Sequence, residues 1–299
     1  MCAYKILNGG TTTKCSRIPW KTSLICFYLL LALMKISSCE AMPSIKEFFF
    51  PTLGNNLIRM TWAHDVYNDA SFQEALNDKS MMIVGDVTMA VRGLSSKKTY
   101  TLYMKDSYNK RGMDLNTFLQ KAADAKSVAV KLNFDDIRDF EESIKVLQAM
   151  SGKIKFPLWL NADTYKMEDK DIDKFLSLCT HNFPKATISI VMFHNGKRLG
   201  SEIGYIAKLV NQMKEALTRN NVTQTVAFPV RINEEADSLD TLQALKDVHG
   251  ITDSAIYMYG LLQGDFKGKP NPNLKKFIED FGKDRVYLDG PEWVVKKYI

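Results

Sequence analysis

The stretch SVAVKLNFDDIRDFEESIKVLQAMSGKIKFPLWLNA, residues 127–162, contains a strand, a helix and a second strand in succession. Its two ends, 127–134 and 156–162, are short apolar runs of the kind that form strands buried on both faces. Between them, apolar residues recur at helical spacing, at Ile137, Phe140, Ile144 and Leu147. A helix that joins two neighbouring strands makes them parallel, so this stretch predicts a parallel α/β sheet.

The same alternation fills most of the chain. Further strands are predicted at 57–63, 81–87, 100–104, 186–193, 225–232, 254–260 and 285–289. Amphipathic stripes predict helices after Asp114, which is a good N-cap, and around 203–217, 239–245 and 274–281. Eight or nine such units in a single domain favour a (β/α)8 barrel of the TIM type over an open doubly wound sheet, and no glycine-rich GxGxxG turn supports the latter.

Two irregularities accompany this prediction. Residues 91–98 are too few for a crossover helix, so the strands at 81–87 and 100–104 are expected to form a hairpin-like pair. Nine candidate strands also exceed the eight places of the barrel. One extra strand or hairpin must therefore lie outside it, and the pattern leaves open which one.

The first 41 residues have the pattern of a secretory signal peptide. Basic residues precede the apolar run 23–34, and small residues follow it, which predicts cleavage within 38–42. A signal anchor is the alternative. The run is short for a membrane span, and no later run is long enough for one. We therefore expect residues 42–299 to form a secreted, extracellular domain with no transmembrane anchor after cleavage.

Charge, cysteine content and one sequence motif indicate which partners and modifications to expect. The formal charge of +6 comes largely from the leader, because residues 42–299 hold 35 basic and 33 acidic side chains. The sequence has no basic stripe with interleaved aromatic residues, so nothing in it indicates a nucleic-acid partner. Only Cys179 follows the leader, so no internal disulfide is expected, and its apolar neighbours predict a buried, inert thiol. Asn221-Val222-Thr223 is an acceptor sequence for N-glycosylation.

Polar side chains stand where the predicted strands end, which in parallel barrels is where chemistry takes place. Lys131 and Asn133 share one side of an otherwise apolar strand, which makes them stronger candidates than loop residues, because buried polar groups need partners. The simpler alternative is that each of these residues is a solvated loop residue. The full set is His64, Asp86, Lys105, Asp106, Lys131, Asn133, Asn161, Asp163, His194, Arg231 and Asp289.

Several motifs in order carry a family resemblance. They are TWAHDVYN (61–68), MMIVGDVT (81–88), VKLNFDD (130–136) with ESIKVL (142–147), PLWLNAD (157–163), FLSLCTHNFPKATISI (175–190) and VAFPVRI (226–232). Together they resemble the Menorin-like domain family, whose barrels look like those of glycerophosphodiester phosphodiesterases. The resemblance covers roughly residues 57 to 291.

The family pattern is only partly kept. The residues that match it are His64, Asp86, Lys131, Trp159, Asn161, Asp163 and Arg231. Three candidate site positions depart from it: Val84 stands for a glutamate, Asp106 for a second histidine, and Asn133 for an aspartate. On the sixth strand, Val191, Met192 and Phe193 also replace the family's Gly-Trp-Thr. The resemblance implies a hard divalent cation, Mg²⁺ or Ca²⁺, held by carboxylates, and the exchanges at Val84 and Asn133 remove anionic oxygens that such an ion prefers.

Three functions remain open. The first is a secreted, catalytically impaired barrel that acts in cell-surface signalling or adhesion by binding an extracellular or cell-surface protein. The second is a divergent metal-dependent phosphodiesterase acting on glycerophosphodiester-like or lysophospholipid substrates. In that enzyme His64 would be the acid/base, Asp86, Asp163 and Asp106 weak metal ligands, and Lys131 and Arg231 phosphate clamps. The third is a metal-free carrier of small anions that uses Lys131 and Arg231.

Overall fold

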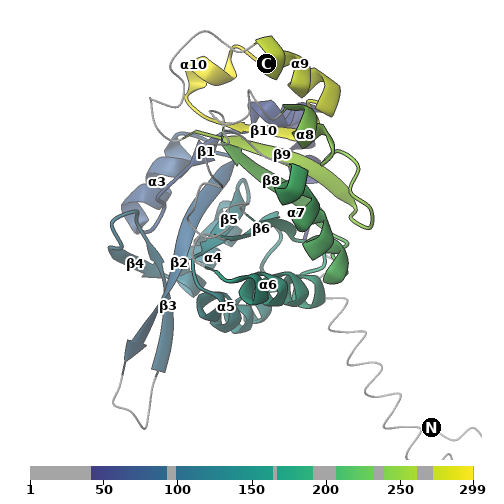
Figure 1. Cartoon of the computed structure of the whole chain (residues 1–299). Helices are drawn as coiled ribbons and strands as arrows, with labels where there is room; N and C mark the ends of the chain where they lie inside the picture. The colour runs from purple at the N-terminus through teal and green to yellow at the C-terminus, as the bar shows by residue number, and fades with distance from the viewer. Residues whose placement is uncertain are drawn as a thin grey trace, which may run out of the picture. The chain divides into compact units, whose positions relative to one another are not determined.

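The computed structural model describes residues 42–92, 99–163, 167–190, 207–231, 239–260 and 272–298. All of them lie in the unit Cys39–Ile299, in which helices surround one large sheet (Figure 1). The leader predicted for residues 1–41, including its cleavage position, lies outside the described residues. None of the helices in the described ranges is long and apolar enough to cross a membrane.

Eight strands pair in parallel and follow one another in chain order. They are β1 (Trp62–Ala63), β2 (Met82–Arg92), β5 (Ala129–Phe134), β6 (Leu158–Ala162), β7 (Thr187–Ile190), β8 (Thr225–Arg231), β9 (Asp253–Tyr259) and β10 (Val286–Asp289). The parallel α/β sheet predicted from the sequence is thereby confirmed. The predicted strand at 57–63 is correct only at its end, because Leu57–Arg59 forms a 3-10 helix, η1.

The expected extra hairpin is present. β2 pairs antiparallel with β3 (Thr99–Lys105), and β3 pairs antiparallel with β4 (Arg111–Asp114), a strand that the sequence analysis missed. β2 pairs with β5 only as far as Val87, so its outer half and β3 project from the body as a two-stranded arm (Figure 1). The strands outside the parallel set are therefore β3 and β4.

Strands β1 and β10 form no backbone ladder with one another in the described ranges. The two ends of the parallel set are linked in other ways. The amide of Leu57 in η1 donates to the carbonyl of Lys283 at 2.8 Å. The side chain of His64, the residue after β1, meets that of Asp289, the last residue of β10. We call the join between β1 and β10 the seam.

Nine α-helices accompany the sheet in the described residues. They are α2 (Ile45–Leu53), α3 (Asp69–Asn77), α4 (Leu115–Ala125), α5 (Ile137–Ala149), α6 (Asp169–Asn182), α7 (Ala207–Arg219), α8 (Leu239–Gln243), α9 (Pro272–Phe281) and α10 (Glu292–Val295). Asp114 caps α4 as predicted, since its Oδ1 accepts from the Thr117 amide at 3.0 Å. Cys179 lies fully buried on α6, and burial raises the pKa of its thiol well above the usual value.

Alternate residues of each strand enter two separate apolar cores. One core lies between the sheet and its helices and includes Phe118 of α4, Phe140 of α5 and Phe175 of α6. The other lies on the inner face of the sheet and includes Val84, Trp159, Tyr257 and Tyr287, from four different strands. Ile45, Phe49 and Leu53 of α2 fill the same inner core at the amino ends of the strands, where Lys46 pairs with Asp253 at 2.7 Å.

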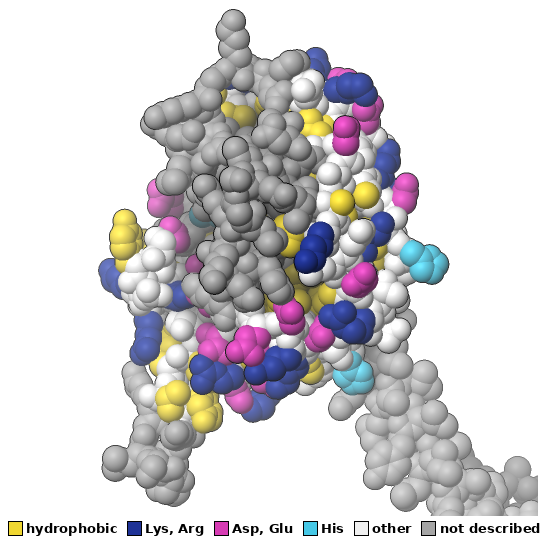
Figure 2. Space-filling model, viewed as in Figure 1, with side chains coloured by type: hydrophobic (Ala, Val, Ile, Leu, Met, Phe, Trp, Pro, Cys, Tyr) yellow, Lys and Arg dark blue, Asp and Glu magenta, His cyan; other side chains and the backbone are white. Residues whose placement is uncertain are grey.

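Surface charge on the outer helices is mixed. In Figure 2 dark blue and magenta side chains alternate over α5 and α6, and no single-sign patch forms on the described part of this face. Lys174 of α6 pairs with Glu141 of α5 at 2.6 Å, and Arg219 of α7 pairs with Asp173 of α6 at 2.6 Å. Such exposed pairs contribute little stability each, so the two cores hold the fold together.

Asp139 predicts a pH-dependent contribution to stability. This carboxylate is 9% exposed and accepts a hydrogen bond from the Met89 amide of β2. Burial, with the Asp136 carboxylate second, raises the pKa of Asp139 to about 6. A carboxyl group that holds its proton more tightly when folded lowers the stability as the pH rises through its unfolded and folded pKa values. We expect Asp139→Asn to raise the free energy of unfolding at pH 7.5 by about 1–3 kcal/mol, with a smaller gain near pH 4.

Urea unfolding of both proteins across this pH range measures the difference. Glu142→Gln, on the exposed side of α5, is the control and should change the stability by less than about 0.5 kcal/mol at either pH. A gain for Asp139→Asn that does not depend on pH would show that the ionisation of Asp139 is not its cause.

Candidate functional site

Four polar residues stand side by side across four strands near the carboxyl ends of the sheet. The strand register pairs Asp86 of β2 with Asn133 of β5, Asn133 with Asn161 of β6, and Asn161 with Ser189 of β7. These positions share the side of each strand that faces the inner core. We call Asp86, Asn133, Asn161 and Ser189 the polar row.

Hydrogen bonds join the row in two pairs, Asp86 with Asn133 and Asn161 with Ser189. The amide of Asn133 donates through Nδ2 to Asp86 Oδ1 at 2.7 Å. The Ser189 hydroxyl donates to Asn161 Oδ1 at 2.5 Å and accepts from Trp159 Nε1 at 2.6 Å. Buried polar groups are stable when they are hydrogen-bonded, so these contacts explain how the row is tolerated inside an apolar core.

Lys131 lies one level below the row and is 5% exposed. Its neighbours in register are Val84 on β2 and Trp159 on β6, and neither offers a counter-charge. Its ammonium instead donates to Asn133 Oδ1 at 2.8 Å and lies 5.0 Å from the centre of the Tyr257 ring. Lys131, Asn133 and Asp86 thus form one chain of hydrogen bonds.

Burial is the largest cause of the pKa shifts of Lys131 and Asp86. It lowers the pKa of Lys131 to about 8, and the carboxylates of Asp289, Asp86 and Asp163 oppose that change. Burial also raises the pKa of Asp86, against the hydrogen bond from Asn133. Both shifts have the direction expected when a charged group leaves water.

A second set of contacts joins β1, β9 and β10. His64 Nε2 lies 2.9 Å from one oxygen of Asp289 and 3.0 Å from the other. Asp289 is 4% exposed and also accepts a hydrogen bond from the buried Tyr257 hydroxyl. The aspartate therefore fixes the orientation of the His64 ring and connects the two strands at the seam.

The other residues predicted from the sequence do not all join the polar row or the His64–Asp289 contact. Asp106 lies in the β3–β4 turn, where its Oδ1 accepts from the Tyr108 amide at 3.0 Å and the Lys110 amide at 2.7 Å. Asp163 follows β6, and its backbone amide donates to the Phe134 carbonyl at 2.9 Å. Arg231 ends β8 beside Tyr259 of β9, but its side chain lies outside the described residues, as does His194.

The donor set does not fit a hard divalent cation well. In the described ranges, no three His, Cys, Asp or Glu side chains converge as a metal site would require. One oxygen of Asp86 accepts from Asn133, the oxygen of Asn133 accepts from the Lys131 ammonium, and Val84 is an apolar residue of the inner core. Mg²⁺ and Ca²⁺ require several oxygen ligands, mostly anionic.

Sequence reasoning missed two residues of the site, Ser189 and Tyr257. Ser189 belongs to a short apolar strand, and a fully buried serine there was a signal of the same kind as Asn133. The Tyr257–Asp289–His64 contacts join residues far apart in the chain, and a single sequence carries no signal for them.

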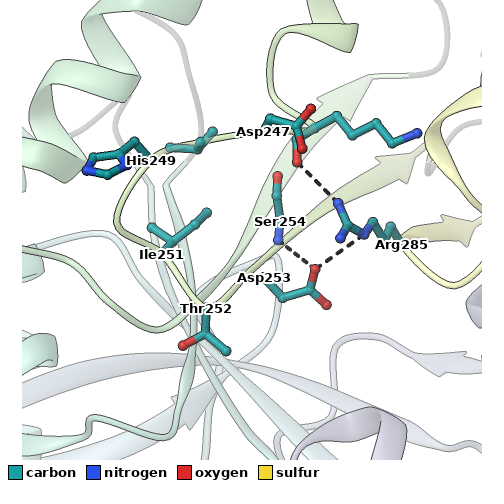
Figure 3. Close-up of a pocket in the computed structure, with 9 residues that line it drawn as sticks. Asp247, His249, Ile251, Thr252, Asp253, Ser254 and Arg285 are labelled. Atoms are coloured by element: carbon teal, nitrogen blue, oxygen red, sulfur yellow. Dashed lines mark hydrogen bonds and ion pairs between the residues drawn. The ribbon is translucent and has the colours of Figure 1, made fainter.

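A separate pocket lies at the amino ends of β9 and β10, away from the polar row. Figure 3 shows Asp253 and Arg285 facing one another there, while His249 lies on the far side. Asp253 accepts from Lys46 at 2.7 Å and lies 3.4 Å from Arg285 Nε, and Arg285 also donates to the Lys246 carbonyl at 3.2 Å. These charged groups satisfy one another, so we interpret this pocket as structural.

The glycosylation sequence lies on the surface near the amino end of β8. Asn221 is exposed in the turn after α7 and adopts a φ of 51°. Thr223 is exposed, and Val222 between them is buried. The Asn221 side chain is therefore accessible to a modifying enzyme on the folded domain.

Replacing Lys131 should make the protein more stable. The lowered pKa means that the buried ammonium costs stability at neutral pH, and Met has a similar length without charge. We expect Lys131→Met to raise the free energy of unfolding at pH 7 by about 1–3 kcal/mol. Between pH 8 and 10.5 the unfolded wild type binds more protons than the folded one, so its stability rises and the difference shrinks. A less stable Lys131→Met protein at pH 7 would show that the ammonium's contacts outweigh its desolvation.

The shared acceptor Asp289 should couple Tyr257 and His64. We expect Tyr257→Phe and His64→Gln each to lower the free energy of unfolding by about 1–2 kcal/mol. In the double variant the two losses should differ from additivity by at least about 0.5 kcal/mol, because both side chains contact one carboxylate. Urea unfolding of the four proteins measures this coupling, and simple additivity would contradict it.

Comparison with known proteins identifies the family. Residues 56–294 match the family described as the Menorin N-terminal domain. The human protein FAM151B is 26% identical over 177 residues, which are 58% of this chain and 62% of that protein, so the match spans less than two thirds of the relative.

Solved structures are more distant. A glycerophosphodiester phosphodiesterase from Parabacteroides distasonis gives a TM-score of 0.46 at 14% identity, covering 82% of this chain and 98% of that one. A putative phosphonomutase from Burkholderia cenocepacia gives a TM-score of 0.42 at 11% identity, and the match covers 85% of this chain and 96% of that one. The family predicted from the motifs is confirmed by the match over residues 56–294: the chain belongs to the Menorin N-terminal domain family.

Proposed function

We propose that this chain is a secreted, catalytically impaired member of its family that acts by binding an extracellular or cell-surface protein in signalling or adhesion. In this proposal the eight parallel strands form a closed (β/α)8 barrel, sealed at the seam by side chains. The barrel is a rigid scaffold, and the contact with the partner lies elsewhere on its surface.

The observation that carries the proposal is the hydrogen-bonded chain from Lys131 through Asn133 to Asp86. A phosphodiesterase of the family pattern would need these positions for an ion and for the phosphate. Here the ammonium and the carboxylate are already joined through a neutral amide. Asp106, which stands for the second histidine, is engaged by two backbone amides.

The phosphodiesterase alternative has one structural argument in its favour. His64 is held by Asp289 in the manner of an oriented acid/base, and its side chain is 32% exposed. The alternative of a small-anion carrier rests on Lys131 alone among the described side chains. Three carboxylates, those of Asp289, Asp86 and Asp163, already act on that ammonium, which weakens its attraction for a further anion.

A restoration experiment tests the loss of the ion site. We expect millimolar Mg²⁺ or Ca²⁺ to leave the wild-type melting temperature unchanged and glycerophosphocholine to remain intact. Val84→Glu with Asn133→Asp adds two carboxylates beside Asp86, so the double variant should be stabilised by these ions, since a ligand of the native state raises its stability. The matched control is Val84→Gln with Asn133 unchanged. Ion-dependent stabilisation or hydrolysis in the wild type would favour the enzyme.

Secretion and surface binding need a separate test. Expressed in cultured animal cells, the full chain should accumulate in the medium, and a glycan-removing enzyme should increase its electrophoretic mobility. Asn221→Gln should abolish that shift without preventing secretion, because Asn221 is an exposed turn residue. The purified chain should then bind saturably to intact cells and lose this binding after surface proteolysis. Retention inside the cells, or uptake only by bare lipid vesicles, would contradict the proposal.

A further inference from the structure

A cavity of about 500 Å³ lies at the seam, beneath the carboxyl-terminal helix α10. Its lining includes Arg59, Met60, Trp62, His64, Val295 and Lys296. The volume lies within the range of about 300–1,000 Å³ that is typical of small-molecule sites. Lys131 and the polar row are not part of the lining, so this cavity is distinct from the polar row.

The cavity has a clear origin in the fold. β1 has two residues and forms no ladder with β10 in the described part of the chain, so the sheet is incomplete there. The helix over this position, α10, has four residues, whereas α4 to α7 have eleven to fourteen. Figure 1 shows α10 next to β10 and above β1. A short strand and a short helix meet at the seam and leave space between them.

The lining combines an apolar wall with two cations and two carboxylates, and Asp289 is already engaged by His64 and Tyr257. Met60, Pro291 and Val295 supply apolar surface, and Arg59 is an exposed cation with no ion pair among the residues that the structure describes. Lys296 adds a second cation, which pairs with Glu292 at 2.7 Å. Trp62 also lines the cavity, and its buried indole Nε1 has no hydrogen-bond partner in the described ranges. Leaving such a buried donor without an acceptor is costly.

We infer that the seam cavity binds a small amphipathic anion, with a carboxylate near Arg59 and a short aliphatic body against Met60, Pro291 and Val295. An arginine binds a carboxylate through two parallel hydrogen bonds, so a carboxylate ligand should bind more tightly than a ligand with a neutral head group. The site is independent of the proposed protein-binding function, because it uses neither the polar row nor the strand residues that depart from the family pattern.

Calorimetric titration with octanoate tests the inference, with 1-octanol and octylammonium as probes of equal chain length and different charge. We expect octanoate to bind at least about tenfold more tightly than the other two, and Arg59→Gln to weaken octanoate by about tenfold or more. Arg59 is exposed, so its replacement leaves the fold intact. Lys297→Gln is the matched control, because Lys297 lies over the Trp293 ring at 4.5 Å and does not line the cavity.

Two further variants locate the bound ligand. Val295→Phe narrows the cavity and should abolish octanoate binding, whereas Lys131→Met should leave it unchanged. Equal binding of octanoate and octanol, or unchanged affinity in Arg59→Gln, would overturn the inference, as would the absence of octanoate binding. Loss of binding in Lys131→Met would place the ligand at the polar row and would also overturn it.

Discussion

The buried ammonium group of Lys131 decides which polar partners the inner face of this sheet must supply. Lys131 is 5% exposed, and its register neighbours Val84 and Trp159 carry no charge. A charge in such surroundings is stable only with partners, and it finds them one level higher, in Asn133 directly and in the field of three carboxylates. Part of the polar row follows from the same constraint, because Asn133 joins the ammonium to Asp86, whereas Asn161 and Ser189 bond to one another and to Trp159.

The sequence predicts the repeating part of this architecture well. Continuous apolar runs separated by amphipathic stripes are a local property of the chain, and the parallel order of β5, β6 and β7 follows from the helices between them. The hairpin of β2 and β3 was predicted for an equally local reason, the shortness of residues 91–98. β4 was missed because its residues, RGMD, have no strand-like pattern and pair with β3 only through tertiary context.

The site was predictable to the extent that it depends on strand parity. Lys131 and Asn133 were correctly placed on one face, and the alignment of Asp86, Asn133 and Asn161 in one row follows from a register that no single sequence reveals. The contact of His64 with Asp289 joins residues 225 positions apart. It depends on how far the sheet curls. The rings that pack across the inner core, those of Trp62, Trp159, Tyr257 and Tyr287, come from four different strands, so no local pattern reveals that curvature.

Two of the departures from the family pattern, at Val84 and Asn133, have a common electrostatic consequence. Val84 and Asn133 each replace a carboxylate of the pattern with a neutral side chain. In the pattern that the resemblance implies, several carboxylates beside one lysine would leave an excess of negative charge for a divalent cation to balance. Without two of them, the Lys131 ammonium balances Asp86 through Asn133, and little charge remains for an ion to neutralise. The polar network that remains is satisfied by hydrogen bonds, and a satisfied network stiffens the interior of a protein. In the proposed function, this satisfied network stabilises a binding scaffold rather than holding a reacting group.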